Sequence, residues 1–475
     1  MICKTIIQKV DLKNKNNFYF SGICGAGMSA LAFALQNLKK KVSGSDVMID
    51  FGKVSPVLMN LKKKRIKLNS QDGSGLSKDV DYLVVSSAIE PDNPDVRKAK
   101  ELGIPIVHRT DLLLALIEDK FQIAIAGSSG KTTTSALAAH LLNTAKVDPS
   151  YFVGGLIKGY KEHEAVYYDQ ESKSIVIETD ESDRTIKKYT PNIGVVLSLC
   201  KDHYGIKELE KVFYNFALQC REKVIINNDD PRLHKQVKRL GKRKTAPKVI
   251  TFGIKNRSDF QAKKIKSIGA SSEFLVGSEK YKINLPGLHN IYNSLSVIAI
   301  GKVLGLKSSV IKKALNSFKG VRRRFELVAS INGVTVIDDF AHNPDKIKAT
   351  ILAAKAISKR LILIYQPHGF YPTLINRNNL LRVWKENLRK NDILILPDIY
   401  IAGGKLEACK DKISSDKLIN NLKKHKVKAH YIIDREEIID FVKNNVRSKD
   451  IVIVMGARDP SLSYFAEKVA QELKK

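Results

Sequence analysis

The sequence predicts an α/β protein of three domains with mostly parallel sheets. Short apolar runs typical of buried strands alternate with helical patterns along almost all of the 475 residues. The chain is too long for one hydrophobic core, and its 43% of hydrophobic residues is enough for several. Two glycine-rich turns, in residues 22–27 and 127–130, each follow an apolar run and precede a helical pattern.

The chain divides into three blocks on sequence grounds. The first, residues 1–118, contains its own glycine turn, and the second, residues 119–319, begins with the turn at 127–130. The third, residues 320–475, begins where GVRRRFE precedes a new strand pattern. We expect each block to form one α/β domain.

Composition and charge exclude several classes of protein. The five cysteines form no C-x-x-C pair, which argues against a disulfide framework and a zinc knuckle. The chain has no signal-peptide core and no apolar run of about 18 residues, so we expect a soluble cytoplasmic protein without a membrane partner. The net charge is +32, but clusters such as residues 62–64 (KKK) contain no interleaved aromatic residues. A lysine-rich solvated surface is therefore favoured over a nucleic-acid partner.

The first block opens with FYFSGICGAGMSALAFALQNLKKKVSGSD, the layout of a nucleotide-binding βαβ unit. Its glycines, Gly22, Gly25 and Gly27, follow the spacing G-x-x-G-x-G in place of G-x-G-x-x-G, and a tight turn without a ligand fits them nearly as well. Asp46 ends the second strand pattern. Its carboxylate is expected either to accept a hydrogen bond from a sugar hydroxyl or to cap the next turn.

The turn in the second block has the features of a phosphate-binding loop. Residues 123–126 predict a buried strand, and residues 131–142 carry apolar residues at helical spacing. Free backbone N–H groups and the helix N-terminus are expected to face an anion. Lys131 can reach the outer phosphates, and the Thr132 hydroxyl can bind Mg²⁺. The loop GSSGKT is shorter than G-x-x-x-x-G-K-[ST], and an ordinary strand-to-helix turn is the alternative.

Candidate Mg²⁺ ligands follow two later strand patterns. SIVIETDESD places Glu178, Asp180, Glu181 and Asp183 at the carboxyl end of an apolar strand, where carboxylates can hold the Mg²⁺ that bridges ATP phosphates. NIGVVLSL leads in the same way to His203. Taken singly, such residues are more often loop carboxylates or surface histidines. Together with the phosphate loop they favour a metal and nucleotide site.

Two asparagines begin a later helical pattern, LPGLHNIYNSLS. Asn290 and Asn293 lie one turn apart on one face of that helix. Their side-chain amides can read a purine edge, and helix capping is the alternative.

The ordered motifs resemble the Mur ligases, ATP-dependent amide-forming enzymes of peptidoglycan synthesis, and most closely the members that add L-alanine. The resemblance covers nearly the whole chain and includes GICGAGMSAL, SGSD, VVSSAIEPDNPDV, GSSGKTTT, ETDESD, LPGLHNIYNSLS, RRFE, DDFAHNPD, QPHGFYPT and DIYIAGG. It implies an N-terminal Rossmann-like domain for a UDP-sugar and a central P-loop ATPase domain of the α/β type. A C-terminal Rossmann-like domain would close over ATP and bring the amino acid.

The resemblance also implies a reaction and its partners. ATP would phosphorylate the carboxylate of UDP-N-acetylmuramate, and the amine of an amino acid, with L-alanine as the first expectation, would attack the acyl phosphate. ATP and Mg²⁺ are the implied cofactors. We expect a monomer or homodimer.

Particular residues take roles from the resemblance. The implied catalytic residues are Lys131, Glu178, His203 and Arg324, and the implied Mg²⁺ ligands are Thr132, Glu178 and His203. The implied ATP-binding residues are Gly127, Ser128, Ser129, Gly130, Lys131, Thr132, Thr133, Asn290, Asn293, Arg324, Asp338 and His342. The implied UDP-sugar-binding residues are Gly22, Gly25, Ala26, Gly27, Met28, Asp46, Ser86 and Ser87. His342 and His368 are the implied amino-acid-binding residues.

The chain departs from the alanine-adding pattern at several positions. Ser129 replaces a loop histidine, and LSL at residues 197–199 replaces T-N-I. Where the family has two arginines in Q-P-H-R-Y-T-R-T, this chain has Gly369 and Pro372, neither of which can grip a carboxylate. The segment MGARDPSLS also differs from the usual ending. The identity of the added amino acid therefore stays open.

Three alternatives to an alanine-adding ligase remain. A sister ligase would add another amino acid or a murein peptide. A ligase-like protein would bind nucleotide without catalysis, although the joint presence of Lys131, Thr132, Glu178 and His203 argues against this. A basic P-loop ATPase acting on nucleic acid would not need the GICGAGMSAL block.

Overall fold

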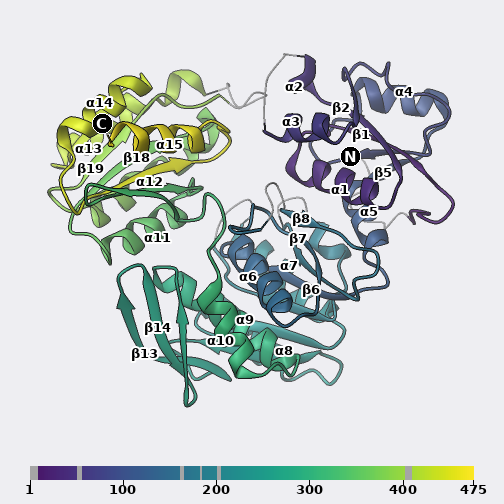
Figure 1. The fold of residues 1–475 in the computed structure, drawn as a ribbon, viewed down its shortest axis with the longest axis horizontal. Helices are drawn as coiled ribbons and strands as arrows, with labels where there is room; N and C mark the ends of the chain where they lie inside the picture. Colours follow the sequence, from purple (N-terminus) through teal and green to yellow (C-terminus); the bar gives the residue numbers. More distant parts are fainter. Residues whose placement is uncertain are drawn as a thin grey trace. The chain divides into compact units, whose positions relative to one another are not determined.

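The computed structural model describes residues 9–50, 56–160, 165–181, 185–200, 205–401 and 409–474. They form two compact units, one made of the chain up to Ala262 with Tyr292–Leu315 and the other of Lys263–Ile291 with Asn316–Lys475. Strands and helices alternate along both units (Figure 1). The α/β class is confirmed, whereas the domain boundaries expected after residues 118 and 319 stay predictions.

The N-terminal sheet is parallel throughout, in the order β3-β2-β1-β4-β5. Its strands are β1 (Asn17–Ser21), β2 (Lys41–Ser45), β3 (Lys67–Asn69), β4 (Tyr82–Val85) and β5 (Ile106–His108). The accompanying helices are α1 (Ala26–Asn37), α2 (Val47–Asp50), α3 (Pro56–Lys63), α4 (Pro94–Leu102) and α5 (Arg109–Leu116). The chain places β2 and β3 on one side of β1 and then crosses to the other side, where β4 and β5 lie. The carboxyl ends of β1 and β4 are therefore a topological switch point, where such sheets bind ligands.

The central sheet has the order β13-β12-β11-β10-β6-β9-β7-β8, with β6 between β10 and β9. These pairs are parallel apart from β7 with β8. The strands are β6 (Phe121–Ala126), β7 (Ser150–Phe152), β8 (Val166–Tyr167), β9 (Ser174–Glu178), β10 (Ile193–Val196), β11 (Lys223–Asn227), β12 (Lys248–Gly253) and β13 (Phe260–Ile268). The helices are α6 (Lys131–Thr144), η1 (Thr185–Lys188), α7 (Ile206–Gln219), α8 (Pro231–Leu240), α9 (Leu288–Val303) and α10 (Ser308–Ser317).

The second unit contains a hairpin and a six-stranded sheet. The hairpin pairs β14 (Ser271–Val276) with β15 (Glu279–Ile283). The sheet has the order β16-β17-β21-β18-β19-β20, and its pairs are parallel except β16 with β17. Its strands are β16 (Glu326–Ile331), β17 (Val334–Asp339), β18 (Leu361–Gln366), β19 (Ile393–Leu396), β20 (Ala429–Tyr431) and β21 (Ile451–Gly456). Its helices are α11 (Pro344–Lys355), α12 (Phe370–Asn387), α13 (Ser415–Lys424), α14 (Arg435–Asn445) and α15 (Leu462–Glu472).

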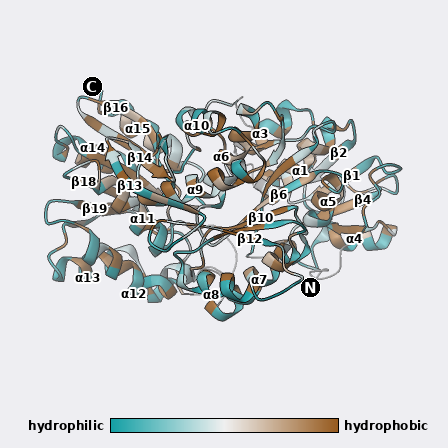
Figure 2. Ribbon diagram, turned by 90° about the horizontal axis from the view of Figure 1, so that it is seen from below, coloured by the Kyte–Doolittle hydropathy of each residue, from teal (hydrophilic) through white to brown (hydrophobic). Residues whose placement is uncertain are grey.

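Helices cover both faces of the C-terminal sheet, which explains why its inner strands β18, β19 and β21 are apolar along most of their length. On one face, α11 and α12 bury Ile351 and Trp384, and on the other, α14 and α15 bury Val442 and Phe465. Hydrophobic residues colour much of the strands in Figure 2, and the helices carry both colours, as amphipathic helices do. No helix within the described ranges is long and apolar enough to cross a membrane.

A buried ion pair ties the N-terminal sheet region to the central one. Lys188 Nζ of η1 lies 2.7 Å from Asp111 Oδ1 of α5, and the two side chains are 2% and 0% exposed. A pair so fully removed from water is costly to break, because removing one partner leaves the other charge buried without compensation. The contact therefore fixes α5 against η1.

We expect Asp111→Ala to lower the free energy of unfolding by about 3 kcal/mol, because the buried Lys188 ammonium would lose the carboxylate that lies 2.7 Å from it. Urea denaturation followed by far-UV circular dichroism measures this change. The control Glu101→Ala removes one partner of the exposed Lys98–Glu101 pair and should cost less than about 0.5 kcal/mol. Equal, small effects of both variants would show that the buried pair does not hold the two regions together.

Candidate active site

The loop between β6 and α6 has the strand-turn-helix geometry that the sequence predicts. Gly127 and Gly130 adopt φ values of +138° and +88°, which glycine tolerates far better than other residues. Gly130 is the N-cap of α6 and no side chain caps the helix. The first-turn N–H groups of a helix lack partners within it, so the uncapped start of α6 favours an anion. Thr133 lies in this first turn and is half-buried.

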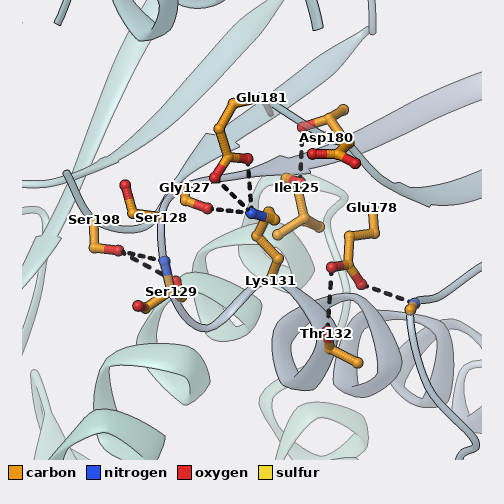
Figure 3. Close-up of polar contacts among 12 residues, drawn as sticks. Ile125, Gly127, Ser128, Ser129, Lys131, Thr132, Glu178, Asp180, Glu181 and Ser198 are labelled. Carbon is orange, nitrogen blue, oxygen red and sulfur yellow. Dashed lines mark hydrogen bonds and ion pairs between the residues drawn. The ribbon is translucent and has the colours of Figure 1, made fainter. Parts of the chain in front are cut away.

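The sequence interpretation expected the backbone N–H groups of the loop to be free. Two of them are not. The N–H groups of Ser128 and Ser129 donate to the backbone oxygen and the Oγ of Ser198, each at 3.0 Å (Figure 3). Ser128 Oγ also donates to Cys200 O at 3.0 Å. The expectation was wrong for these two amides because the segment after β10 runs directly beside the loop. The donors left for an anion at this loop are therefore the N–H groups at the start of α6 and the Lys131 ammonium.

Lys131 lies between the loop backbone and a buried carboxylate. Its Nζ donates to Gly127 O at 2.7 Å and to the two carboxylate oxygens of Glu181 at 2.9 and 2.7 Å (Figure 3). Burial by itself would lower the pKa of Lys131, but the charges of Glu181 and Glu178 outweigh burial and raise that pKa. Lys131 is therefore a cation at neutral pH, held at the position from which a phosphate would be met.

Glu178 and Thr132, two of the predicted Mg²⁺ ligands, are in direct contact. Thr132 Oγ1 donates to Glu178 Oε1 at 3.1 Å, and the N–H of Gly154 donates to Oε2 at 2.8 Å. Among the residues described, no three His, Cys, Asp or Glu cluster in a way that would hold a metal alone. Mg²⁺ at nucleotide sites needs only one or two carboxylates besides phosphates and waters, so this pair fits it. His203 and Asp183 lie outside the described residues.

The two predicted adenine-binding residues, Asn290 and Asn293, are both buried on α9. Asn293 lies against the phosphate loop, since a Cβ atom on Gly130 would come within 2.6 Å of its Oδ1. Asn290 Nδ2 donates to Pro286 O at 2.8 Å, in the turn that precedes the helix. The structure thus brings Asn293 to the loop, and the adenine contact of both residues stays a prediction.

The N-terminal glycine turn lies at the switch point between β1 and β4. Gly22 has φ +78°, and its N–H donates to Ser45 O at 2.8 Å. Asp46 accepts hydrogen bonds from the N–H groups of Cys24 at 2.9 Å and Met48 at 3.0 Å. Its carboxylate therefore caps the turn, which was one of the two expected roles, and a sugar contact stays a prediction.

The remaining predicted UDP-sugar residues lie around the same turn. Gly25 is the N-cap of α1, which begins at Ala26, and Met28 is buried in the first turn of that helix. Ser86 and Ser87 directly follow β4, and Ser87 Oγ lies 3.1 Å from His108 Nε2. Their interaction with a UDP-sugar stays a prediction.

The sequence interpretation missed Arg109, which lies close to the N-terminal glycine turn and to the segment that follows β9. A Cβ atom on Gly27 would come within 2.8 Å of its Nη1, and its Nη2 lies 3.6 Å from Asp180 Oδ2, after β9. No motif marks this residue. Its one sequence signal is its position directly after the strand pattern IPIVH. Arg109 places a cation beside the glycine turn.

In the second unit, Asp338 lies at the carboxyl end of β17 and is buried. Ser463 Oγ donates to its Oδ2 at 2.7 Å, and Arg323 Nε lies 3.5 Å from its Oδ1. Arg324, the arginine that the resemblance selects, lies with its guanidinium 4.8 Å from the centre of the Phe340 ring. The neighbouring Arg323 therefore contacts the Asp338 carboxylate. A phosphate contact of Arg324 stays a prediction.

The structure brings the two predicted amino-acid-binding histidines together. The rings of His342 and His368 meet edge to face with centroids 5.6 Å apart. Gly369, which follows His368, is the N-cap of α12, and Pro372 lies in the first turn of that helix. The departures from the family motif therefore fall at one helix N-terminus.

Three family models match the chain: the Mur ligase family catalytic domain over residues 17–121, the Mur ligase middle domain over 125–301, and the Mur ligase glutamate ligase domain over 323–458. A UDP-N-acetylmuramate--L-alanine ligase of Sulfurihydrogenibium sp. (strain YO3AOP1) is 32% identical over 465 residues, covering 95% of this chain and 98% of its own length. The chain belongs to the Mur ligase family. A second protein of that name, from Caldanaerobacter subterraneus subsp. tengcongensis, is 34% identical and covers 98% of this Mur ligase and all of its own length.

Solved Mur ligase structures share the fold. The UDP-N-acetylmuramate-alanine ligase of Thermotoga maritima superposes with a TM-score of 0.77 at 24% identity, covering 96% of this chain and 98% of its own. A murein peptide ligase of Psychrobacter arcticus reaches 0.68 at 22% identity, covering 97% and 99%. The chain has the Mur ligase fold of N-terminal, central and C-terminal α/β domains, as the sequence predicts.

We expect Gly130→Ala to lower stability by about 1–2 kcal/mol and to abolish binding of ADP. The added methyl group would lie 2.6 Å from Asn293 Oδ1, in a backbone conformation that alanine adopts at a cost. Thermal unfolding and titration calorimetry with ADP measure the two effects. The control Gly241→Ala, at φ −61° with the nearest atom 3.5 Å away, should leave both unchanged. Wild-type ADP affinity in Gly130→Ala would contradict the assignment of this loop to phosphate.

Proposed function

We propose that the protein is an ATP-dependent ligase that joins an amino acid, L-alanine in the first instance, to the carboxylate of UDP-N-acetylmuramate. The observation that carries the proposal is the arrangement of Lys131, Thr132 and Glu178 at the adjoining ends of β6 and β9. The similar proteins named UDP-N-acetylmuramate--L-alanine ligase support the choice of substrates. Both substrates and ATP are consistent with a cytoplasmic enzyme.

The reaction proceeds in two chemical steps. A carboxylate oxygen of the sugar attacks the γ-phosphorus of ATP, ADP leaves, and an acyl phosphate forms. The amine of the amino acid then attacks the acyl carbon, and the resulting tetrahedral intermediate expels phosphate and leaves an amide. Phosphoryl transfer needs mainly positioning and neutralisation of charge, which a buried cation and a helix N-terminus provide.

Residues of this chain provide the positioning and the charge neutralisation that phosphoryl transfer needs. Lys131 neutralises negative charge on the transferring phosphoryl group once phosphate oxygens replace Glu181 at its Nζ. The start of α6 adds backbone donors. Thr132 and Glu178 would hold one Mg²⁺, and His203 matches the family histidine at a second Mg²⁺ site. The metal would neutralise negative charge on the phosphates. The N-terminal turn beside Arg109 would receive the UDP-sugar.

A sister activity is the second candidate function. Gly369 and Pro372 supply no cation where the alanine-adding pattern has two arginines, so a different amino acid or a short peptide would enter there. A non-catalytic role is disfavoured because the half-buried Lys131 and the Thr132–Glu178 contact have the arrangement that phosphoryl transfer needs.

The deciding assay measures phosphate release from ATP and Mg²⁺ with UDP-N-acetylmuramate, and identifies the product by mass spectrometry. L-alanine, glycine and L-serine are tested singly beside a murein tripeptide. Release that depends on a single amino acid supports the proposal. Release with the tripeptide alone favours the sister activity, and no release with any of them would refute the ligase assignment.

We expect Lys131→Met to reduce turnover by at least about 10³-fold, because the transferring phosphoryl group loses the half-buried cation that neutralises it. The variant leaves Glu181 buried without its partner, so the double variant Lys131→Met/Glu181→Gln separates lost folding from lost catalysis. Circular dichroism should show that the double variant is folded and the assay that it is inactive. Lys146→Met, at an exposed position after α6, should keep wild-type turnover. A double variant that is folded and active would show that Lys131 is not needed for phosphoryl transfer.

A further inference from the structure

Three neighbouring strands of the second unit end at one edge of the sheet. β21 lies between β17 and β18, with Asp338 paired to Val454 and Gln366 paired to Gly456. Parallel strands in register deliver the residues that follow them to the same edge. The segments that begin at residues 340, 367 and 457 therefore lie side by side. Two of them carry the contacting histidines, His342 and His368.

The middle segment carries Arg458, two residues beyond the end of β21. Its side chain is exposed and its backbone has φ +68°, a conformation that costs free energy for any residue except glycine. Within the described ranges, Arg458 makes no hydrogen bond or ion pair. A strained backbone that presents a cation at a sheet edge is a reason to look for a ligand.

The other arginines at this edge are already engaged. Arg323 Nη2 donates to Gly456 O at 2.8 Å and its Nε approaches Asp338, while Arg324 lies over the Phe340 ring. Arg435 forms an ion pair of 2.5 Å with Asp459. Of these four arginines, Arg458 is the one whose guanidinium is available to a bound anion.

Two further features beside Arg458 suit an anion. The 18-residue helix α12 begins after Gly369 with no side-chain cap, and the N–H groups of Phe370 and Tyr371 meet no acceptor in the described part of the chain. His368 Nδ1 is buried and, among described residues, has no hydrogen-bond partner. Burial and the charge of Arg458 lower the pKa of His368 to about 4, so its ring is neutral at pH 7.

We propose that Arg458 and the N-terminus of α12 bind the α-carboxylate of the incoming amino acid. The inference rests on the proposed function. That reaction consumes the amine of the amino acid and leaves its carboxylate ionised, so the carboxylate needs a cation and N–H donors when it leaves water. Arg458 replaces, from a different strand, the cations that Gly369 and Pro372 cannot provide. It is a substrate-binding residue that determines specificity for a free carboxylate.

The test compares wild type, Arg458→Gly and the matched control Lys426→Gly in the phosphate-release assay. Glycine adopts the left-handed backbone of Arg458 without strain, so Arg458→Gly should fold. Lys426 is exposed, basic and also left-handed (φ +61°), but it lies at the end of α13. Each protein is assayed with L-alanine and with L-alaninamide, in which an uncharged amide replaces the carboxylate. The KM for ATP is measured alongside.

We expect Arg458→Gly to raise the KM for L-alanine about 10- to 100-fold, the loss typical of one charge-assisted contact, with kcat changed less than about threefold. Wild type should prefer L-alanine to L-alaninamide in kcat/KM, and Arg458→Gly should lose most of that preference. Lys426→Gly should behave as wild type.

Three results would overturn the inference. Arg458→Gly could retain both the wild-type KM and the preference for the carboxylate, which would show that Arg458 does not bind it. A raised KM for ATP with an unchanged KM for L-alanine would assign Arg458 to phosphate. If the wild-type protein releases no phosphate with any amino acid, the proposed function is wrong, and this inference fails with it.

Discussion

The parallel pairing of β6 with β9 and β10 is the constraint on which the phosphate site depends. Ile125 pairs with Glu178 and Ala126 with Val196, so the three strands end at nearly the same level. Parallel strands need both faces covered, and the helices that cover them leave the carboxyl edge for the loops. That edge therefore collects a glycine loop, a carboxylate pair and the segment containing Ser198. A slip of one residue in β9 would turn Glu178 to the other face of the sheet.

Under the proposed function, the contact between Lys131 and Glu181 would couple nucleotide binding to the charge balance of the site. In a buried setting an unpaired ammonium is costly, and the Glu181 carboxylate compensates it at 2.7 Å. The phosphates of a bound ATP would offer the same compensation with more charge, so they would compete with Glu181 for the Lys131 ammonium. Glu178 keeps its separate contacts with Thr132 and Gly154. Two carboxylates three residues apart therefore serve different partners, one the lysine and the other the hydroxyl.

The sequence supports the architecture and the phosphate loop well, because strand patterns, glycines and the positions of carboxylates after strands are local signals. It could not show that Glu181 pairs with Lys131, since that contact joins residues 50 positions apart. The use of the Ser128 and Ser129 amides by Ser198 depends on strand order in the same way. Arg109 and Arg458 were also missed as site residues: Arg109 stands in no motif, and Arg458 lies in the segment MGARDPSLS, whose difference from the family ending did not reveal a role for it. Each matters only through the strand end that delivers it.

The capping of the N-terminal turn by Asp46 also affects the chemistry of the neighbouring thiol. Burial, together with the negative charge of Asp46, raises the pKa of Cys24 to about 12. At neutral pH the sulfur is therefore a thiol and not the nucleophilic thiolate. Electrophilic inhibitors directed at this turn would find no reactive cysteine, although one stands among the glycines. Compounds directed at this turn need to gain affinity through reversible contacts with the backbone and with Arg109.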